Sequence, residues 1–169
     1  MSRLPVFPIV CCISKGDTTA ANFEFKKTEI CKKVERASGQ GVNFFQIREK
    51  RLSARLLFEL TQAVVEAASP GLKILVNGRA DIALAARADG VHLPTDGVPV
   101  ENLRKCTPAN FIIGVSAHSV REVRSAKACG ADFAAFAPIF KTPGKDNPAG
   151  LEMLREVCDA VNPFPVIAL

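Results

Sequence analysis

Short apolar runs and helix-like segments alternate along the whole chain, and this alternation restricts the fold more than any other feature. Most of the runs are continuously apolar, as expected of parallel strands buried on both faces. Such repeating units predict an α/β protein, either a doubly wound sheet or a (β/α)₈ TIM barrel. The predicted strands are Pro8–Ser14, Val42–Ile47, Lys73–Val76, Gly90–Leu93, Phe111–Ser116, Asp132–Ala137 and Pro165–Leu169. The predicted helices are Glu29–Ala37, Ala54–Ala68, Arg79–Arg87, Val100–Lys105, Val120–Cys129 and Leu151–Val161.

The barrel is favoured over the doubly wound sheet. A nucleotide-binding sheet carries a glycine-rich loop after its first strand, whereas Ser14-Lys15-Gly16-Asp17 matches neither GxGxxG nor GxxxxGK[ST]. A complete barrel typically has ~200–250 residues, and this sequence of 169 residues stops in the seventh predicted strand. We therefore expect residues 1–169 to form a single TIM-barrel domain, truncated within the seventh strand and lacking the last one to two βα units.

Two segments repeat one local pattern. Ala86-Arg87-Ala88-Asp89-Gly90-Val91 and Ala128-Cys129-Gly130-Ala131-Asp132-Phe133 each lead from the end of a helix into a strand. The pattern predicts the same turn twice, with a glycine at the turn.

Composition narrows the class of protein. A hydrophobic content of 48% with 23% charged residues excludes a disordered chain. Lys and Arg exceed Asp and Glu by five, but they are scattered and no Tyr or Trp is present, which disfavours nucleic acid and suits small phosphorylated substrates. No apolar run reaches the roughly 18 residues that would cross a membrane. The six cysteines lack CxxC spacing, so we interpret them as small apolar residues of a cytoplasmic protein.

Polar residues gather where five of the predicted strands end, which is where barrel enzymes carry their chemistry. After the second strand, Gln46, Arg48 and Lys50 alternate with a period of two, which predicts three hydrogen-bond donors on one face of the strand end. The alternative for these three residues is a solvated charge cluster. The other polar strand ends are Asn77–Asp81, His92–Gly97, Ser116–Ser119 and Pro138–Lys145.

The motifs at these strand ends resemble those of the thiamine phosphate synthase/thiazole tautomerase (TenI) superfamily. Five of them follow the order and spacing of that superfamily between about Val42 and Leu169, and before Val42 the resemblance is only that of a first barrel strand. The motifs are QIREK, LVNGRADIALAARADGVHLP, IIGVSAHS, FAPIFKTPGK and AGLEMLREV…FPVIAL. The resemblance implies a TIM barrel, thiamine biosynthesis, a phosphorylated thiazole or pyrimidine as the substrate, and a possible homodimer.

Two positions separate the branches of this superfamily. In the synthase, two aspartates hold Mg²⁺ against the pyrophosphate of the aminopyrimidine substrate, and the corresponding positions here are Gly78 and Gly97. Asp96 is adjacent to Gly97, but a shift of one residue points its carboxylate in another direction, so we do not treat it as the equivalent ligand. Glycine offers no ligand to Mg²⁺, so the resemblance predicts no metal or other cofactor unless the protein is a synthase.

The Asn-Gly-Arg and His-Leu-Pro forms favour the tautomerase branch, in which an isomerase moves a double bond to make a carboxythiazole phosphate aromatic. His118 matches the acid/base position of the superfamily, and histidine suits proton transfer because it titrates near neutral pH. A structural histidine is the alternative, and synthases carry this residue too. His92 lies within an apolar strand and is expected to be a core residue.

Substrate binding is predicted for a further set of polar residues. Thr142 and Lys145 resemble the synthase Thr-x-Thr-Lys loop, with Gly144 in place of the second threonine; the alternative for Lys145 is a solvated loop lysine. Three functions therefore stay open: a thiazole tautomerase, which the sequence favours, a thiamine phosphate synthase, which is a transferase, and a non-catalytic phosphate-binding paralogue. The predicted substrate-binding residues are Gln46, Arg48, Lys50, Asn77, Ser116, Thr142 and Lys145.

Overall fold

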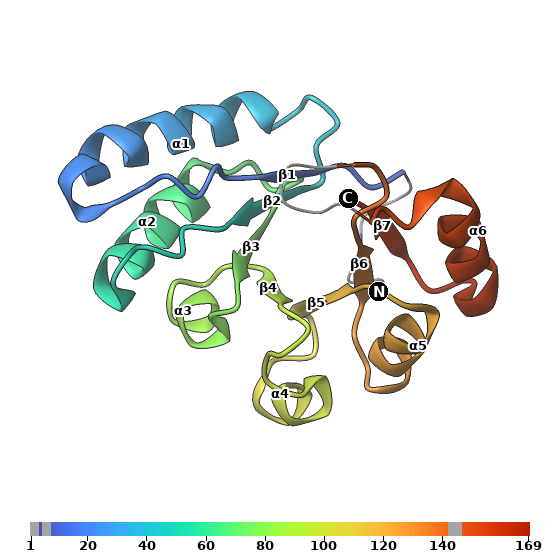
Figure 1. The fold of residues 1–169 in the computed structure, drawn as a ribbon. Coiled ribbons are helices and arrows are strands. Elements are labelled where there is room, and N and C mark those ends of the chain that lie inside the picture. The colour runs from blue at the N-terminus through green and yellow to red at the C-terminus, as the bar shows by residue number, and fades with distance from the viewer. Residues whose placement is uncertain (1–3, 5–7, 142–146) are drawn as a thin grey trace. The chain divides into compact units, whose positions relative to one another are not determined.

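The computed structural model describes Leu4 and the residues 8–141 and 147–169. Strands and helices alternate along the chain, as the sequence predicts (Figure 1). The chain divides into two compact units, Met1–His92 (unit 1) and Leu93–Leu169 (unit 2), and the division falls before the last residue of one strand, β4. Each unit is described separately below.

The described residues of unit 1 include four parallel strands whose spatial order follows the chain order. Their register places Phe45 beside both Cys12 and Ile74, and Asn77 beside His92. The elements of unit 1 are β1 (Cys11–Ile13), the 3₁₀ turn η1 (Ala20–Asn22), α1 (Phe23–Ala37), β2 (Phe44–Ile47), α2 (Ala54–Ala67), β3 (Lys73–Asn77), α3 (Ala80–Ala85) and β4 (Gly90–Leu93).

Unit 2 repeats this arrangement, and its described residues include three parallel strands, again in chain order. Its elements are α4 (Val100–Cys106), β5 (Ile112–Ala117), α5 (Val120–Ala128), β6 (Phe133–Phe136), α6 (Gly150–Val161) and β7 (Val166–Ala168). Parallel neighbours in sequential order, each strand followed by a helix, are the arrangement expected of a barrel rather than of a doubly wound sheet, in which the strand order reverses.

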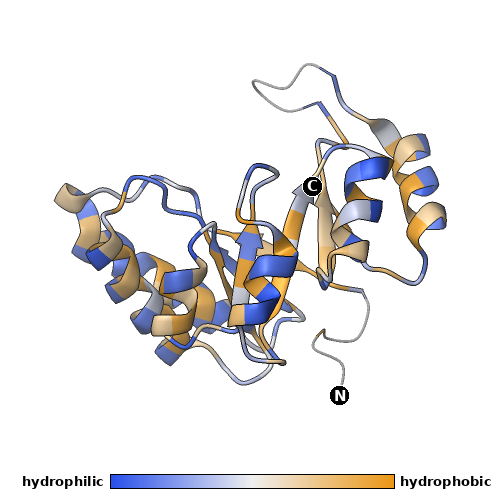
Figure 2. Cartoon of the chain, turned by 90° about the horizontal axis from the view of Figure 1, so that it is seen from below, coloured by the Kyte–Doolittle hydropathy of each residue, from blue (hydrophilic) through white to orange (hydrophobic). Residues whose placement is uncertain are grey.

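Burial explains why the strand predictions succeed. β2, β4 and β6 are buried at every position, which agrees with the continuous apolar runs in the sequence. The helices are amphipathic and carry hydrophobic and hydrophilic residues on different sides (Figure 2). In unit 2, α5 and α6 pack Val123, Val157 and Val161 against Phe136 of β6.

The predicted bounds differ from the structure mainly at the first helix. α1 begins at Phe23 rather than at Glu29, because Phe23 is buried and the charged residues that follow it form ion pairs. The first strand is shorter than predicted and covers only Cys11–Ile13.

The interpretation of the cysteines as apolar filling residues is wrong in part. Cys106 and Cys158 are exposed and the other four are half-buried, so none of the six is fully buried in the core. In the described residues all six are free thiols. No helix in the part of the chain that the structure describes is long and apolar enough to cross a membrane.

Candidate functional site

Unit 1 brings Gln46 and Asn77 together at the ends of β2 and β3. The Gln46 side chain is buried, with 2% of the residue exposed. Its Nε2 donates to Asn77 Oδ1 at 3.0 Å, and its Oε1 lies 2.6 Å from His92 Nδ1. A carbonyl oxygen only accepts, so His92 Nδ1 carries the proton in this arrangement. The three side chains form one directed hydrogen-bonded series across β2, β3 and β4, which we call the Gln46–Asn77–His92 network.

His92 is buried, as the sequence predicts, but it is also polar and bonded. Burial lowers its pKa to about 4, and the positive charge of Arg48 contributes to the same shift. The ring is therefore neutral at neutral pH and has a single N–H to donate. The partner of that N–H could not be predicted, because Gln46 lies 46 residues away in the sequence.

Arg48 and Lys50 lie beyond the end of β2 and are exposed. The expected alternation on one strand face therefore does not continue past Ile47, since the chain turns there. The backbone N–H of Arg48 donates to Ser14 Oγ at 2.8 Å, which joins the segment to the end of β1. Gly16 lies close to the same residue: a Cβ added to Gly16 would come within 3.1 Å of the Arg48 carbonyl oxygen.

Glu49, between the predicted substrate-binding residues Arg48 and Lys50, is a buried residue of the candidate site that the sequence did not indicate. It is buried, with 3% exposed, and its carboxylate accepts hydrogen bonds from the backbone N–H groups of Gly16 (3.0 Å) and Thr18 (2.9 Å). It thereby joins the loop after β1 to the loop that carries Arg48. Its position within a run of charged residues gave no signal that it is buried.

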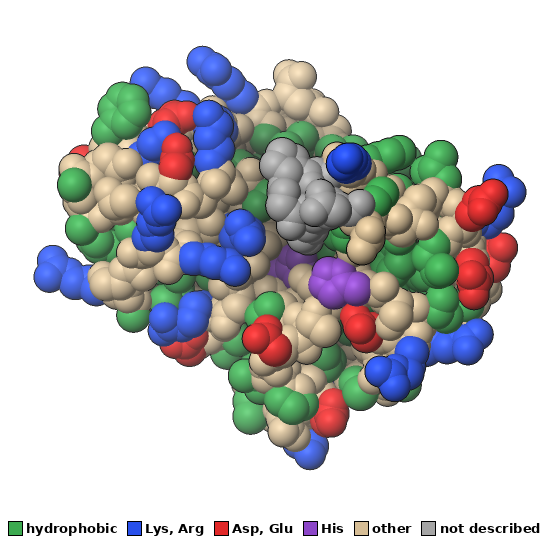
Figure 3. Space-filling view, in the orientation of Figure 1, with side chains coloured by type: hydrophobic (Ala, Val, Ile, Leu, Met, Phe, Trp, Pro, Cys, Tyr) green, Lys and Arg blue, Asp and Glu red, His purple; other side chains and the backbone are tan. Residues whose placement is uncertain are grey.

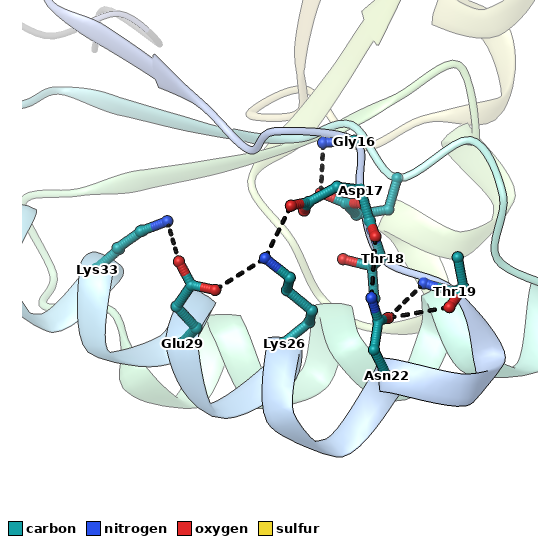
Figure 4. A network of polar contacts seen from close by, with 9 residues as sticks. Gly16, Asp17, Thr18, Thr19, Asn22, Lys26, Glu29 and Lys33 are labelled. Atoms are coloured by element: carbon teal, nitrogen blue, oxygen red, sulfur yellow. Dashed lines mark hydrogen bonds and ion pairs between the residues drawn. The ribbon is translucent and has the colours of Figure 1, made fainter.

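A surface network continues from this loop to α1 (Figure 4). Lys26 bridges Asp17 (2.8 Å) and Glu29 (3.0 Å), and Lys33 binds Glu29 at 2.7 Å. Hydrogen bonds from Lys33 and Lys26 lower the pKa of Glu29 to about 2. Figure 3 shows acidic side chains among the basic ones over the α1 and α2 part of unit 1. These lysines are therefore compensated by carboxylates.

In unit 2, the predicted residues Ser116 and His118 lie at the end of β5. Ser116 is half-buried, and its carbonyl oxygen accepts a hydrogen bond from Thr95 Oγ1 at 3.3 Å. His118 follows the last strand residue and is exposed, while its Nδ1 lies 2.6 Å from the carbonyl oxygen of Ala137. Nδ1 must be the protonated nitrogen in this contact, which leaves Nε2 as the nitrogen able to exchange a proton with a substrate.

The N-terminus of α5 fixes the backbone at His118. Ser119 caps the helix by accepting from the Glu122 N–H at 3.2 Å, and Glu122 accepts the His118 N–H at 2.7 Å. The Ser119 hydroxyl satisfies one N–H of the first helical turn, and the Glu122 carboxylate joins the residue before the cap to that turn. His118 borders a cavity of about 800 Å³ that is also lined by Ser119, Arg121, Pro138, Asn147, Met153 and Glu156. Thr142 and Lys145 lie outside the described residues.

Gly78 and Gly97, which the resemblance aligns with the Mg²⁺ ligands of synthases, carry no side chain that could bind a metal ion. Gly78 has a φ of +69° and donates its N–H to the His92 carbonyl oxygen at 2.8 Å. A Cβ added to Gly97 would lie 3.0 Å from the Pro94 carbonyl oxygen. Nearby, Asp81 is engaged by Arg79. In the described ranges, no group of three His, Cys, Asp or Glu side chains is arranged to hold a metal ion.

A family model and individual relatives with related names match this chain. The model of the family described as thiamine monophosphate synthase matches residues 18–169. The chain is 44% identical over 140 residues to a protein named putative thiamine-phosphate synthase 2 from Aquifex aeolicus, covering 80% of this chain and 74% of the relative. It is 41% identical to a putative thiamine-phosphate synthase from Geobacter sulfurreducens, covering 80% of this chain and 65% of the relative.

Solved structures confirm the predicted fold class. Thiamine phosphate pyrophosphorylase from Pyrococcus furiosus matches with a TM-score of 0.77 and 27% identity, covering 99% of this chain and 75% of that chain. A 3-dehydroquinate dehydratase from Aquifex aeolicus matches with a TM-score of 0.60 at 15% identity, covering 95% of this chain and 79% of that chain, which shows a shared fold alone. The fold is thus the α/β barrel type, and the chain belongs to the thiamine monophosphate synthase family.

Proposed function

We propose that the protein acts as a thiamine phosphate synthase, a transferase that joins an aminopyrimidine diphosphate to a thiazole phosphate. The observation that carries the proposal is the likeness to relatives named putative thiamine-phosphate synthase and to a solved thiamine phosphate pyrophosphorylase. In the reaction, the thiazole nitrogen attacks the methylene carbon of the pyrimidine. A C–N bond forms, the C–O bond breaks, and its electron pair leaves with pyrophosphate.

The charge on the leaving pyrophosphate is the main demand of this chemistry, because charge that develops in the transition state needs donors already in place. Unit 1 offers the guanidinium of Arg48, the ammonium of Lys50 and the side-chain amide of Asn77 in the segments where β2 and β3 end. The backbone N–H of Arg48 is held by Ser14, and Glu49 holds the neighbouring loop. Arg48 is suited to bind a phosphate oxygen pair in a bidentate manner.

A comparison of two arginine variants tests this assignment. Arg48→Gln should lower kcat/KM for thiamine phosphate formation by about a hundredfold, which corresponds to ~3 kcal/mol for a lost charged hydrogen bond. Arg55→Gln, on the exposed surface of α2, is the matched control and should leave the rate unchanged. Equal rates for Arg48→Gln and the unaltered protein would contradict the proposed role of Arg48.

A thiazole tautomerase is the second candidate, and one observation favours it. The two positions that carry Mg²⁺-binding aspartates in synthases are glycines whose surroundings disfavour a larger residue. His118, with Nδ1 bonded to Ala137 and Nε2 left for proton transfer, is arranged for acid/base catalysis. In this case His118→Ala should abolish conversion of the carboxythiazole phosphate in a protein that still folds. Near-normal conversion by that variant would exclude the role.

A further inference from the structure

Three consecutive strands of unit 1 each contribute one side chain to the Gln46–Asn77–His92 network defined above. Gln46 and His92 are buried, with 2% and 6% exposed, whereas Asn77 is half-buried at the end of β3. A backbone hydrogen bond also connects these strand ends: Gly78 donates its N–H to the carbonyl oxygen of His92 at 2.8 Å. His92 is therefore joined to the segment that carries Asn77 by two separate routes.

The network has a direction that begins at the histidine. A neutral imidazole has one N–H, and here Nδ1–H faces Gln46 Oε1. This contact leaves Gln46 Nε2 to donate to Asn77, so that Asn77 Oδ1 is occupied as an acceptor. The Asn77 NH₂ group is consequently the part of the amide that Gln46 leaves for a ligand. If His92 carried its proton on Nε2 instead, both amides would have to turn over, and Asn77 would offer an oxygen.

We propose that His92 is a positioning residue that acts through Gln46 to hold the Asn77 amide with its NH₂ group directed to the ligand. The site then selects a hydrogen-bond acceptor, such as a phosphate oxygen, at the end of β3. This inference rests on the proposed function for the identity of the ligand, but not for the orientation of the amide.

The test compares His92→Leu with His92→Asn. Leucine is apolar and removes the donor to Gln46. Asparagine is the conservative replacement, because its Nδ2 lies close to the position of the histidine Nδ1 and preserves the donor. Both proteins are first checked by circular dichroism and thermal melting, and their affinity for inorganic pyrophosphate is then measured by calorimetry. We expect His92→Leu to weaken pyrophosphate binding by about fivefold to tenfold, the value of one hydrogen bond, and His92→Asn to stay within about threefold of the unaltered protein.

The same substitution in an Asn77→Ala background separates positioning from packing. If His92 acts through the Asn77 amide, His92→Leu should have no further effect on pyrophosphate affinity once that amide is gone. An equal loss in both backgrounds, or a well-folded His92→Leu protein that binds pyrophosphate normally, would overturn the proposal. Absence of pyrophosphate binding by the unaltered protein would overturn it as well. Because none of these measurements requires turnover, a failure to make thiamine phosphate would contradict the proposed function and leave this result standing.

Discussion

Arg87 and Gly130 occupy the same position in two copies of one turn, with φ angles of +59° and +89°. In both copies the next residue donates its N–H to a helical carbonyl oxygen, Ala88 to Ala83 at 2.8 Å and Ala131 to Ala126 at 3.0 Å. The sequence predicts a glycine at the turn of both copies, but the glycine of the first copy, Gly90, lies inside β4. The left-handed position is thus filled by an arginine in unit 1 and by a glycine in unit 2.

Replacing Arg87 by glycine should stabilise the protein. A left-handed conformation costs a residue with a Cβ about 1–2 kcal/mol. Glycine removes this cost, but it loses more conformational entropy on folding, so only part of the gain remains. We expect Arg87→Gly to raise the free energy of unfolding by about 0.5–1 kcal/mol in urea titrations. Arg87→Ala keeps the strain and serves as the control, and Gly130→Ala should destabilise. A stabilisation by Arg87→Ala equal to that by Arg87→Gly would show that the side chain, not φ, is responsible.

Gly114 of β5 lies directly beside Phe133 of β6, and any side chain at position 114 would overlap the phenylalanine ring. Gly114→Ala should therefore lower the free energy of unfolding by about 1–3 kcal/mol, the usual effect of overpacking a core. Adding Phe133→Leu should recover part of this loss, because the shorter side chain frees the space. Additive effects of the two substitutions in a double-mutant cycle would contradict the steric explanation.

The buried carboxylate of Glu49 should be needed for the loop after β1. Glu49→Gln turns one of its two acceptor oxygens into a donor that faces a backbone N–H, either of Gly16 or of Thr18. We expect a loss of about 1–3 kcal/mol in stability and faster hydrogen exchange at the Gly16 and Thr18 amides. Lys50→Gln, an exposed neighbour, should change neither quantity. Unchanged exchange at both amides in Glu49→Gln would show that the two hydrogen bonds contribute little.

Stability should fall as the solution is acidified towards pH 4, because of His92. Its pKa is about 4 in the folded protein against 6.5 ordinarily, so below pH 6.5 the unfolded chain binds a proton that the folded chain does not. The stability that neutral His92 contributes is fully present above pH 6.5 and is lost as the pH falls from 6.5 towards 4. Between pH 7.5 and pH 5 we expect a loss of about 2 kcal/mol in the free energy of unfolding. His92→Asn should lack this component, and an identical pH dependence in both proteins would refute the assignment.

Much of the fold could be predicted because the strands are buried on both faces and therefore appear as continuous apolar runs. The bounds of β4 agree with the prediction residue for residue. The beginning of α1 could not be predicted, because Lys26 interrupts the apolar pattern and only its ion pairs with Asp17 and Glu29 explain its place in the helix. The left-handed φ of Arg87 could likewise not be predicted, because this conformation is normally expected at glycine.

The candidate site could be predicted by position but not by interaction. Gln46, Asn77 and Ser116 lie at strand ends, as expected from their place after apolar runs. The bond between Gln46 and His92 joins residues far apart in the sequence, and it depends on the register of three strands. Glu49 was missed for a different reason, since its charge suggested exposure while two backbone N–H groups hold it in the interior.

The proposed reaction transfers the aminopyrimidinylmethyl group to the thiazole nitrogen and releases pyrophosphate. The most direct measurement incubates the protein with aminopyrimidine diphosphate and thiazole phosphate in the presence of Mg²⁺, and quantifies thiamine phosphate and pyrophosphate over time. We predict that both products appear in equal amounts and that Arg48→Gln slows the formation of both to the same extent. No thiamine phosphate, with conversion of the non-aromatic carboxythiazole phosphate to its aromatic isomer in a parallel reaction, would contradict the synthase and identify an isomerase instead.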